Sequence, residues 1–195
     1  MEAKRAIFLD KDGTLIPDIP YNVKPELIRL NDGVLNGLAL LKDKYVFIVV
    51  SNQSGIAQGL FKKEALMGVE TRLNTLLAEA GINLPNFYYC PHHEDEQCIC
   101  RKPKPGLLFK AAHELQIDLA QSWMIGDILH DVEAGKNAGC KSILVDVGNE
   151  TEWKVNGNVN RIPDFIARNF EDAVAHILKK DLKQLNYEKQ LPQFV

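Results

Sequence analysis

The chain has 195 residues, of which 46% are hydrophobic and 25% charged, and its formal net charge is −3 at pH 7. This length suits one well-cored domain better than two, and the composition is that of an ordinary globular protein. The small negative charge provides no general attraction to nucleic acid or to anionic membranes.

The N-terminal residues lack the apolar segment of a signal peptide, and no apolar stretch approaches the ~20 residues that cross a bilayer. We therefore expect a cytoplasmic protein without a membrane partner. In that reducing compartment, the four cysteines are better suited to binding a metal than to forming disulfides.

Short apolar runs alternate with helical patterns along the chain, and this alternation predicts the fold class. We expect strands at Ala6–Leu9, Tyr45–Val50, Phe87–Tyr89, Trp123–Gly126 and Ser142–Val145, and helices at 34–41, 66–77, 107–115, 131–138 and 170–179. Such a pattern favours a single α/β domain with a parallel sheet covered by helices on both faces. We assign residues 1–180 to this domain and 181–195 to a C-terminal tail, either disordered or docked.

The first predicted strand runs into Asp10-Lys11-Asp12-Gly13-Thr14. It delivers two carboxylates to the strand's C-terminal end, which is where open α/β sheets bind ligands. One carboxylate can attack a phosphorus atom while the other handles a proton. An acidic turn without catalytic function fits the motif equally well when it is considered alone.

Polar residues also follow two later strands. The second strand ends in Ser51-Asn52-Gln53-Ser54-Gly55, where a hydroxyl and exposed amides can donate to a phosphoryl oxygen, or simply form a turn. The fourth ends in Gly126-Asp127, placed to share Mg²⁺ with Asp10 or to cap the next helix. Asp131 fits either metal ligation or a supporting contact.

A basic loop, Arg101-Lys102-Pro103-Lys104-Pro105-Gly106, precedes the third predicted helix. Beside a carboxylate cluster its cations would neutralise a phosphate, and Lys102 would offset the charge of Asp10. A solvated basic turn is the alternative. Four signals that are weak separately fall where an α/β phosphate site needs them.

Cysteine and histidine gather immediately before the basic loop, as Cys90-Pro91-His92-His93 and Cys98-Ile99-Cys100. Three thiolates and one imidazole form a tetrahedral set suited to a structural Zn²⁺. Spacing does not distinguish His92 from His93 as the nitrogen ligand. The fourth cysteine, Cys140, fits a small buried residue.

The ordered motifs Asp10-x-Asp12-Gly13-Thr14, Ser51, Lys102 and Gly126-Asp127-x-x-x-Asp131 resemble those of the haloacid dehalogenase (HAD) superfamily. The resemblance spans residues 6–131, and the second aspartate is similar to the phosphatase branch. It implies that Asp10 is the nucleophile and Asp12 the acid and base. It further implies that Ser51 and Lys102 hold the phosphoryl group, while Asp10, the Asp12 carbonyl and Asp127 hold Mg²⁺.

Within that superfamily, residues 51–57 and the two cysteine-containing loops resemble the D-glycero-D-manno-heptose 1,7-bisphosphate 7-phosphatases. This resemblance favours His92 as the zinc ligand with Cys90, Cys98 and Cys100. It also implies that Asn52 and Arg101 contact the substrate. About 36 residues separate Thr14 from Ser51, which leaves no room for a large cap domain.

The resemblance implies a small phosphorylated sugar as substrate and a role in making nucleotide-activated heptose. Histidinol-phosphate phosphatases share the zinc loop and form the alternative, and Ile128 departs from the lysine found in many heptose enzymes. A catalytically dead, zinc-stabilised binding module is the alternative of another class. We expect a monomer with no nucleic-acid partner.

Overall fold

The structure, a computed structural model, describes residues 3–190 and contains one parallel sheet. Its strands lie in the order β3-β2-β1-β4-β5-β6. Their bounds are β1 Ala6–Leu9, β2 Val46–Asn52, β3 Phe87–Cys90, β4 Trp123–Gly126, β5 Lys141–Val145 and β6 Phe165–Ala167. The predicted fold class is confirmed, and the five predicted strands are present with ends shifted by at most two residues.

Within the described part of the chain, five α-helices connect or follow these strands: α1 Val34–Leu41, α2 Leu66–Ala78, α3 Gly106–Leu115, α4 Leu129–Ala138 and α5 Phe170–Gln190. Short 3-10 helices are η1 Pro25–Leu27, η2 Lys63–Ala65, η3 Glu94–Glu96, η4 Leu119–Gln121 and η5 Val159–Arg161. Because α4 begins two residues earlier than expected, Asp131 lies in its first turn.

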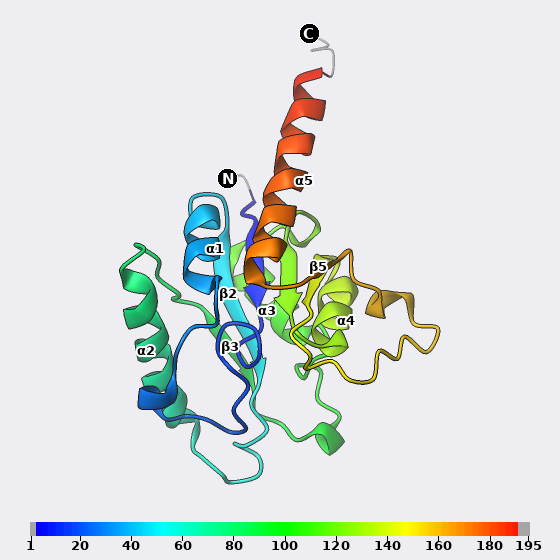
Figure 1. Cartoon of the computed structure of the whole chain (residues 1–195). Coiled ribbons are helices and arrows are strands. Elements are labelled where there is room, and N and C mark those ends of the chain that lie inside the picture. The colour runs from blue at the N-terminus through cyan, green and yellow to red at the C-terminus, as the bar shows by residue number, and fades with distance from the viewer. Residues whose placement is uncertain (1–2, 191–195) are drawn as a thin grey trace.

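The helices form two layers, one on each face of the sheet (Figure 1). Alternate residues of the central strands point to opposite faces, as in β1, where Ile7 and Leu9 join one core and Ala6 and Phe8 the other. The first core is completed by α1, α2 and α5, and the second by α3 and α4. Burial on both faces explains why these strands are almost continuously apolar.

Two features at the C-terminal part of the chain differ from expectation. The three-residue edge strand β6 lies in a stretch for which we predicted no strand, and it pairs with β5. Helix α5 continues through the predicted boundary between Lys180 and Asp181 and projects away from the body of the molecule (Figure 1). Asp181 accepts hydrogen bonds from Tyr45 and Arg5, so the helix is docked at that point. Residues 191–195 lie outside the described residues.

No helix within residues 3–190 combines the length and the apolar character needed to cross a membrane.

Candidate active site

The candidate site lies at the C-terminal edge of three adjacent strands. Asp10 follows β1, Ser51 is near the end of β2, and Asp127 follows β4; all three side chains are buried. The chain passes from β1 to β2 and β3 on one side of the sheet, and the connection after β3 then crosses back to place β4 on the other side of β1. Such a switch in strand order creates the crevice in which open α/β sheets bind ligands.

Two glycines allow the acidic side chains to approach one another. A Cβ atom on Gly13 would collide with the carboxylate of Asp127, and Gly13 also has a φ of +88°. A Cβ atom on Gly126 would collide with the side chain of Asp131. These glycines therefore leave room for carboxylates that the neighbouring backbone would otherwise exclude.

Lys102 reaches this acidic cluster from the loop after β3. Its ammonium group pairs with Asp10 and, at 2.6 Å, with Asp131, and donates to the carbonyl of Val50 at 2.9 Å. Burial opposes its positive charge, but the two carboxylates outweigh that effect and raise the pKa of Lys102. The lysine therefore stays charged beside Asp10.

Asp10, Asp127 and Asp131 place one carboxylate oxygen each within 4.8 Å of the others. Burial is the main cause that raises the pKa of Asp10 well above its usual value; Lys102 opposes the shift, and the neighbouring carboxylates add to it. Burial, and then the charge of Asp131, raises the pKa of Asp127 to about 6. Burial and crowding therefore disfavour ionisation of Asp10 and Asp127.

This excess of buried negative charge fits a divalent cation. Asp127 receives hydrogen bonds from the Thr14 hydroxyl at 3.0 Å and the Asn149 amide at 2.8 Å, which orient its two oxygens. Mg²⁺ prefers hard oxygen ligands, including one or two carboxylates. The predicted ligands Asp10 and Asp127 are thus brought together, and Asp131 joins them, held by Lys102.

Asp127 does not cap α4, which removes one alternative raised by the sequence. The free N–H groups at that helix start bond elsewhere: Leu129 donates to Glu150 at 2.7 Å and Ile128 to Asp131 at 3.4 Å. Sequence reasoning missed Glu150 and Asn149, because both lie on the loop after β5, which carries no recognisable motif.

Asp12 extends beyond the buried acids and is partly exposed. One of its oxygens lies 2.9 Å from the ammonium of Lys11, and the other accepts a hydrogen bond of 2.9 Å from the Gln53 amide. The same amide nitrogen of Gln53 donates to the hydroxyl of Ser51, also at 2.9 Å. The two predicted catalytic residues Asp12 and Ser51 are therefore linked by a glutamine that we had not assigned to the site.

Asn52 and Arg101, predicted to contact substrate, already have contacts within the chain. The Asn52 amide donates to the carbonyl of Lys102 at 3.1 Å, and its oxygen accepts from the Lys102 N–H at 3.0 Å. Asn52 thereby fixes the backbone of Lys102. Arg101 donates to the carbonyl of His92 at 3.4 Å and is half-buried. Their contacts with substrate stay predictions.

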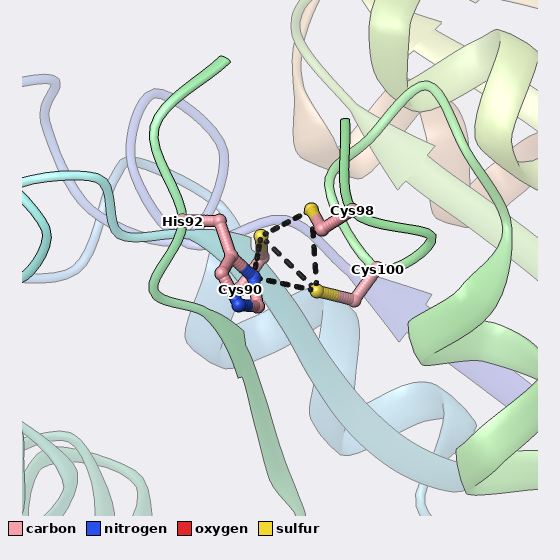
Figure 2. Close-up of side chains that lie close together, drawn as sticks. All are labelled: Cys90, His92, Cys98 and Cys100. Carbon is pink, nitrogen blue, oxygen red and sulfur yellow. Dashed lines mark hydrogen bonds between the residues drawn. The ribbon is translucent and has the colours of Figure 1, made fainter. Parts of the chain in front are cut away.

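The cysteine and histidine side chains converge as expected (Figure 2). The Cys100 sulfur lies 3.2 Å from Nδ1 of His92, 3.3 Å from the sulfur of Cys90 and 3.5 Å from that of Cys98. A zinc tetrahedron with bonds of about 2.3 Å separates its sulfurs by about 3.8 Å. The cluster therefore has nearly the size that a zinc ion requires.

His93 lies outside this cluster. Its Nδ1 is 3.1 Å from a carboxylate oxygen of Asp95, and its backbone N–H donates to the carboxylate of Glu96, the last residue of η3. The fourth cysteine, Cys140, is buried in the core beneath α3 and α4. The structure thus separates the two histidines that the sequence spacing left equivalent.

The cysteine cluster is also connected to the acidic cluster through the main chain. The carbonyl of Cys90 accepts a 2.7 Å hydrogen bond from the N–H of Gln53, and Cys100 precedes Arg101 and Lys102 directly. Lys104 donates to the carbonyl of Cys98 at 2.7 Å, and the Lys102–Pro103 peptide is cis. The loop that carries Cys98 and Cys100 is therefore the loop that positions Lys102.

Comparison with known proteins agrees with this geometry. Residues 99–173 match the model of a family described as HAD-hydrolase-like. The D-glycero-beta-D-manno-heptose-1,7-bisphosphate 7-phosphatase of Haemophilus influenzae is 39% identical over 184 residues, which cover 90% of this chain and 97% of that protein. The corresponding enzyme of Escherichia coli K12 is 37% identical over 169 residues, 77% of this chain and 88% of that one.

A solved structure is also similar: D,D-heptose 1,7-bisphosphate phosphatase from B. bronchiseptica, complexed with magnesium and phosphate. It superimposes with a TM-score of 0.79 at 30% sequence identity, covering 90% of this chain and 99% of the other. That enzyme was thus observed with a cation and an anion of the kinds that the carboxylates and Lys102 fit here.

Proposed function

Because the chain belongs to the D-glycero-beta-D-manno-heptose-1,7-bisphosphate 7-phosphatase family of HAD-like hydrolases, we propose that it removes the C7 phosphate of that sugar bisphosphate. The observation that carries the proposal is the convergence of Asp10, Asp12, Ser51 and Lys102 at one edge of the sheet. The chain that brings them together is 39% identical to one of those enzymes. The reaction would supply an intermediate of nucleotide-activated heptose.

The phosphoryl group binds between Asp10, Lys102 and the Ser51 hydroxyl. The charge of Lys102 and the hydroxyl of Ser51 offset the three phosphoryl oxygens, whose negative charge repels an attacking carboxylate. Asn52 binds the backbone of Lys102 and Arg101 precedes that lysine in the chain; both are proposed to contact the rest of the substrate.

Asp10, the carbonyl of Asp12 and Asp127 would hold Mg²⁺, which supplies positive charge to the phosphoryl oxygens when bound. Asp131 sits against Lys102 and offers a further oxygen to the same cluster. Asn149 and Thr14 keep Asp127 oriented toward it.

The first chemical step joins a carboxylate oxygen of Asp10 to phosphorus and breaks the bond between phosphorus and the C7 oxygen. Asp12, protonated, gives its proton to that leaving oxygen, so the sugar departs as an alcohol. A positioned general acid of this kind contributes roughly 10²–10⁴-fold.

The second step hydrolyses the aspartyl-phosphate. Water attacks phosphorus, Asp12 now accepts the proton of that water, and the bond between phosphorus and Asp10 breaks to release inorganic phosphate. Asp12 ends the cycle protonated and Asp10 ends it as a carboxylate, so both residues return to their starting state.

Cys90, His92, Cys98 and Cys100 are proposed to hold a structural Zn²⁺, since four protein ligands leave no open position for chemistry. Burial opposes ionisation of Cys98, but the N–H of Arg101 and the neighbouring thiols lower its pKa to about 7. A thiol that ionises near neutral pH is a ready zinc ligand.

The substrate is tested by comparing kcat/KM for the heptose 1,7-bisphosphate with that for histidinol phosphate, in the presence of Mg²⁺. We expect the heptose ester to be preferred by at least about 100-fold and phosphate to be lost from C7 alone. A preference for histidinol phosphate would overturn the substrate. Absence of any hydrolysis, with Asp10→Asn as the blank, would instead favour a non-enzymatic binding module.

Three further properties complete the proposal: a cytoplasmic location, a monomeric state, and no nucleic-acid or membrane partner. The net charge of −3 supports the last of these. Sedimentation analysis at micromolar concentration measures the monomeric state directly.

A further inference from the structure

Asp12 is held from two sides by residues that no step of the proposed mechanism uses. Lys11 is buried, with 1% of its side chain exposed, although it lies between the two acids of the Asp10-x-Asp12 motif. Its ammonium group is 2.9 Å from Oδ1 of Asp12. A buried lysine is costly unless it has a partner, and this pair supplies one.

Gln53 holds the other oxygen. Its side-chain nitrogen lies 2.9 Å from Oδ2 of Asp12 and 2.9 Å from Oγ of Ser51, which uses both N–H groups of the amide. The residue is only 6% exposed, and its backbone N–H is fixed by the carbonyl of Cys90 at the end of β3. The amide therefore has little freedom to move away from Asp12.

We propose that Lys11 and Gln53 are positioning residues that hold the Asp12 carboxyl group where it reaches the leaving oxygen of the phosphate ester. The proposal rests on the role of Asp12 as general acid. Oδ1 of Asp12 has one contact, with Lys11, and Oδ2 has one, with Gln53. Each oxygen therefore keeps a second lone-pair direction for the transferred proton.

The physical reason is the dependence of proton transfer on geometry. A general acid acts within about 2.6–3.2 Å of the atom that it protonates, and small displacements of a catalytic group are costly. Asp12 is partly exposed and its carboxyl group could rotate into solvent without such contacts. Through Gln53 its distance from the phosphate-binding hydroxyl of Ser51 is limited to about two hydrogen-bond lengths.

The test compares two aryl phosphates that differ in their need for an acid. Phenolate requires protonation as it leaves, whereas p-nitrophenolate is stable enough to leave without it. We expect Gln53→Met to lower kcat/KM for phenyl phosphate about 10- to 100-fold more than for p-nitrophenyl phosphate. Any loss through Ser51 affects both esters and cancels in this ratio.

Lys11→Met should change the ratio in the same direction, and it provides the test through Oδ1 should Gln53→Met not fold. Neither substitution should change the ratio further in an Asp12→Asn background, because the group through which they act is already lost. Gln58→Met is the matched control: Gln58 lies on the same loop, contacts Tyr21, and should leave the ratio at the wild-type value.

Equal losses for both esters in folded Gln53→Met and Lys11→Met proteins would overturn the proposal, as would a further change of the ratio in the Asp12→Asn background. Hydrolysis of the heptose bisphosphate by the wild-type protein is measured separately. A protein that fails on the heptose but shows the expected aryl ratios refutes the proposed substrate and leaves the positioning role supported.

Discussion

Two clusters of side chains suited to a metal lie within residues 3–190, and they are built in opposite ways. The carboxylates of Asp10, Asp127 and Asp131 are all buried, and they start from the ends of two central strands and the first turn of α4. Of the Cys90, His92, Cys98 and Cys100 group, only Cys90 is buried, and the others belong to the loop between β3 and α3. The sheet and α4 hold the carboxylates in place, whereas most of the cysteine cluster lies on a loop, outside the strands and helices.

This difference predicts different consequences for damage. At the acidic cluster, the sheet and the two cores continue to hold the backbone when a side chain changes, so chemistry is lost before structure. At the cysteine cluster, a segment with few apolar residues would depend on a bound metal for its structure. Loss of a ligand should therefore disorder the loop first and impair chemistry only through Lys102.

The largest expected effect is that of Asp10→Asn. The substitution removes the proposed nucleophile and should lower kcat/KM by about 10⁴-fold or more. Because the strands around it are unchanged, the thermal unfolding temperature should stay within a few degrees of wild type. Steady-state kinetics measure kcat/KM, and calorimetry measures the unfolding temperature. Unfolding of this variant would show that the acidic cluster is needed for folding, which would contradict the contrast between the two clusters.

Next in size is Asp12→Asn. An amide cannot donate or accept the transferred proton, so kcat should fall by roughly 10²–10⁴-fold while KM changes little. Titration with the heptose bisphosphate at saturating Mg²⁺ separates the two constants. Near-normal Mg²⁺-dependent turnover would remove Asp12 from its assigned role.

Loss of the proposed zinc ion should have a smaller effect on catalysis than these substitutions and a larger effect on the structure of the loop. Cys98→Ser should lower the zinc content and raise KM about 20-fold, because Arg101 and Lys102 lose their fixed backbone. Metal analysis, kinetics and amide hydrogen exchange over residues 91–105 measure these changes. Cys140→Ser is the control, since Cys140 is buried outside the cluster. Unchanged kinetics in a verified zinc-free protein would break the proposed connection.

The smallest expected effect concerns pH. Since the pKa of Asp127 is raised to about 6 in the metal-free protein, a proton competes with Mg²⁺ below that pH. The competition disappears above it, where the carboxylate is already ionised. Affinity for Mg²⁺ should therefore fall about tenfold between pH 7 and pH 5 through this group. Isothermal titration at the two pH values tests it, and equal affinities would contradict the raised pKa.

Much of the molecule could be predicted from the sequence because several segments carry strong local signals. The strand before Asp10 is continuously apolar and ends in a recognisable motif, and the cysteines have a spacing that few other structures require. By contrast, β6 has three residues with only Ala167 buried, so its pattern carries almost no information. The docking of α5 at Asp181 involves hydrogen bonds from Arg5 and Tyr45, which are far away in the sequence.

The site was predicted at the level of its chemical groups but not of their supports. A role for Lys11 could not be predicted, because a lysine between two acids is equally compatible with solvent exposure. Only the packing of the folded chain shows that it is buried. Gln53 stood in a polar turn, and its bridge between Asp12 and Ser51 depends on two chain segments 41 residues apart. Asn149 reaches Asp127 from 22 residues away. Such contacts follow from the fold, not from local spacing.

Gly13 and Gly126 have a consequence for how this sequence can vary. At each, the first carbon of any side chain would occupy space filled by a carboxylate, and at Gly13 the backbone conformation also disfavours every other residue. At Gly59 an added carbon meets nothing within 4 Å, although its φ is also positive. In a library of single substitutions, we expect the first two positions to tolerate no replacement and Gly59 to tolerate asparagine. Selection on this site therefore acts on Gly13 and Gly126 as strictly as on the carboxylates of Asp127 and Asp131 that occupy the space beside their alpha carbons.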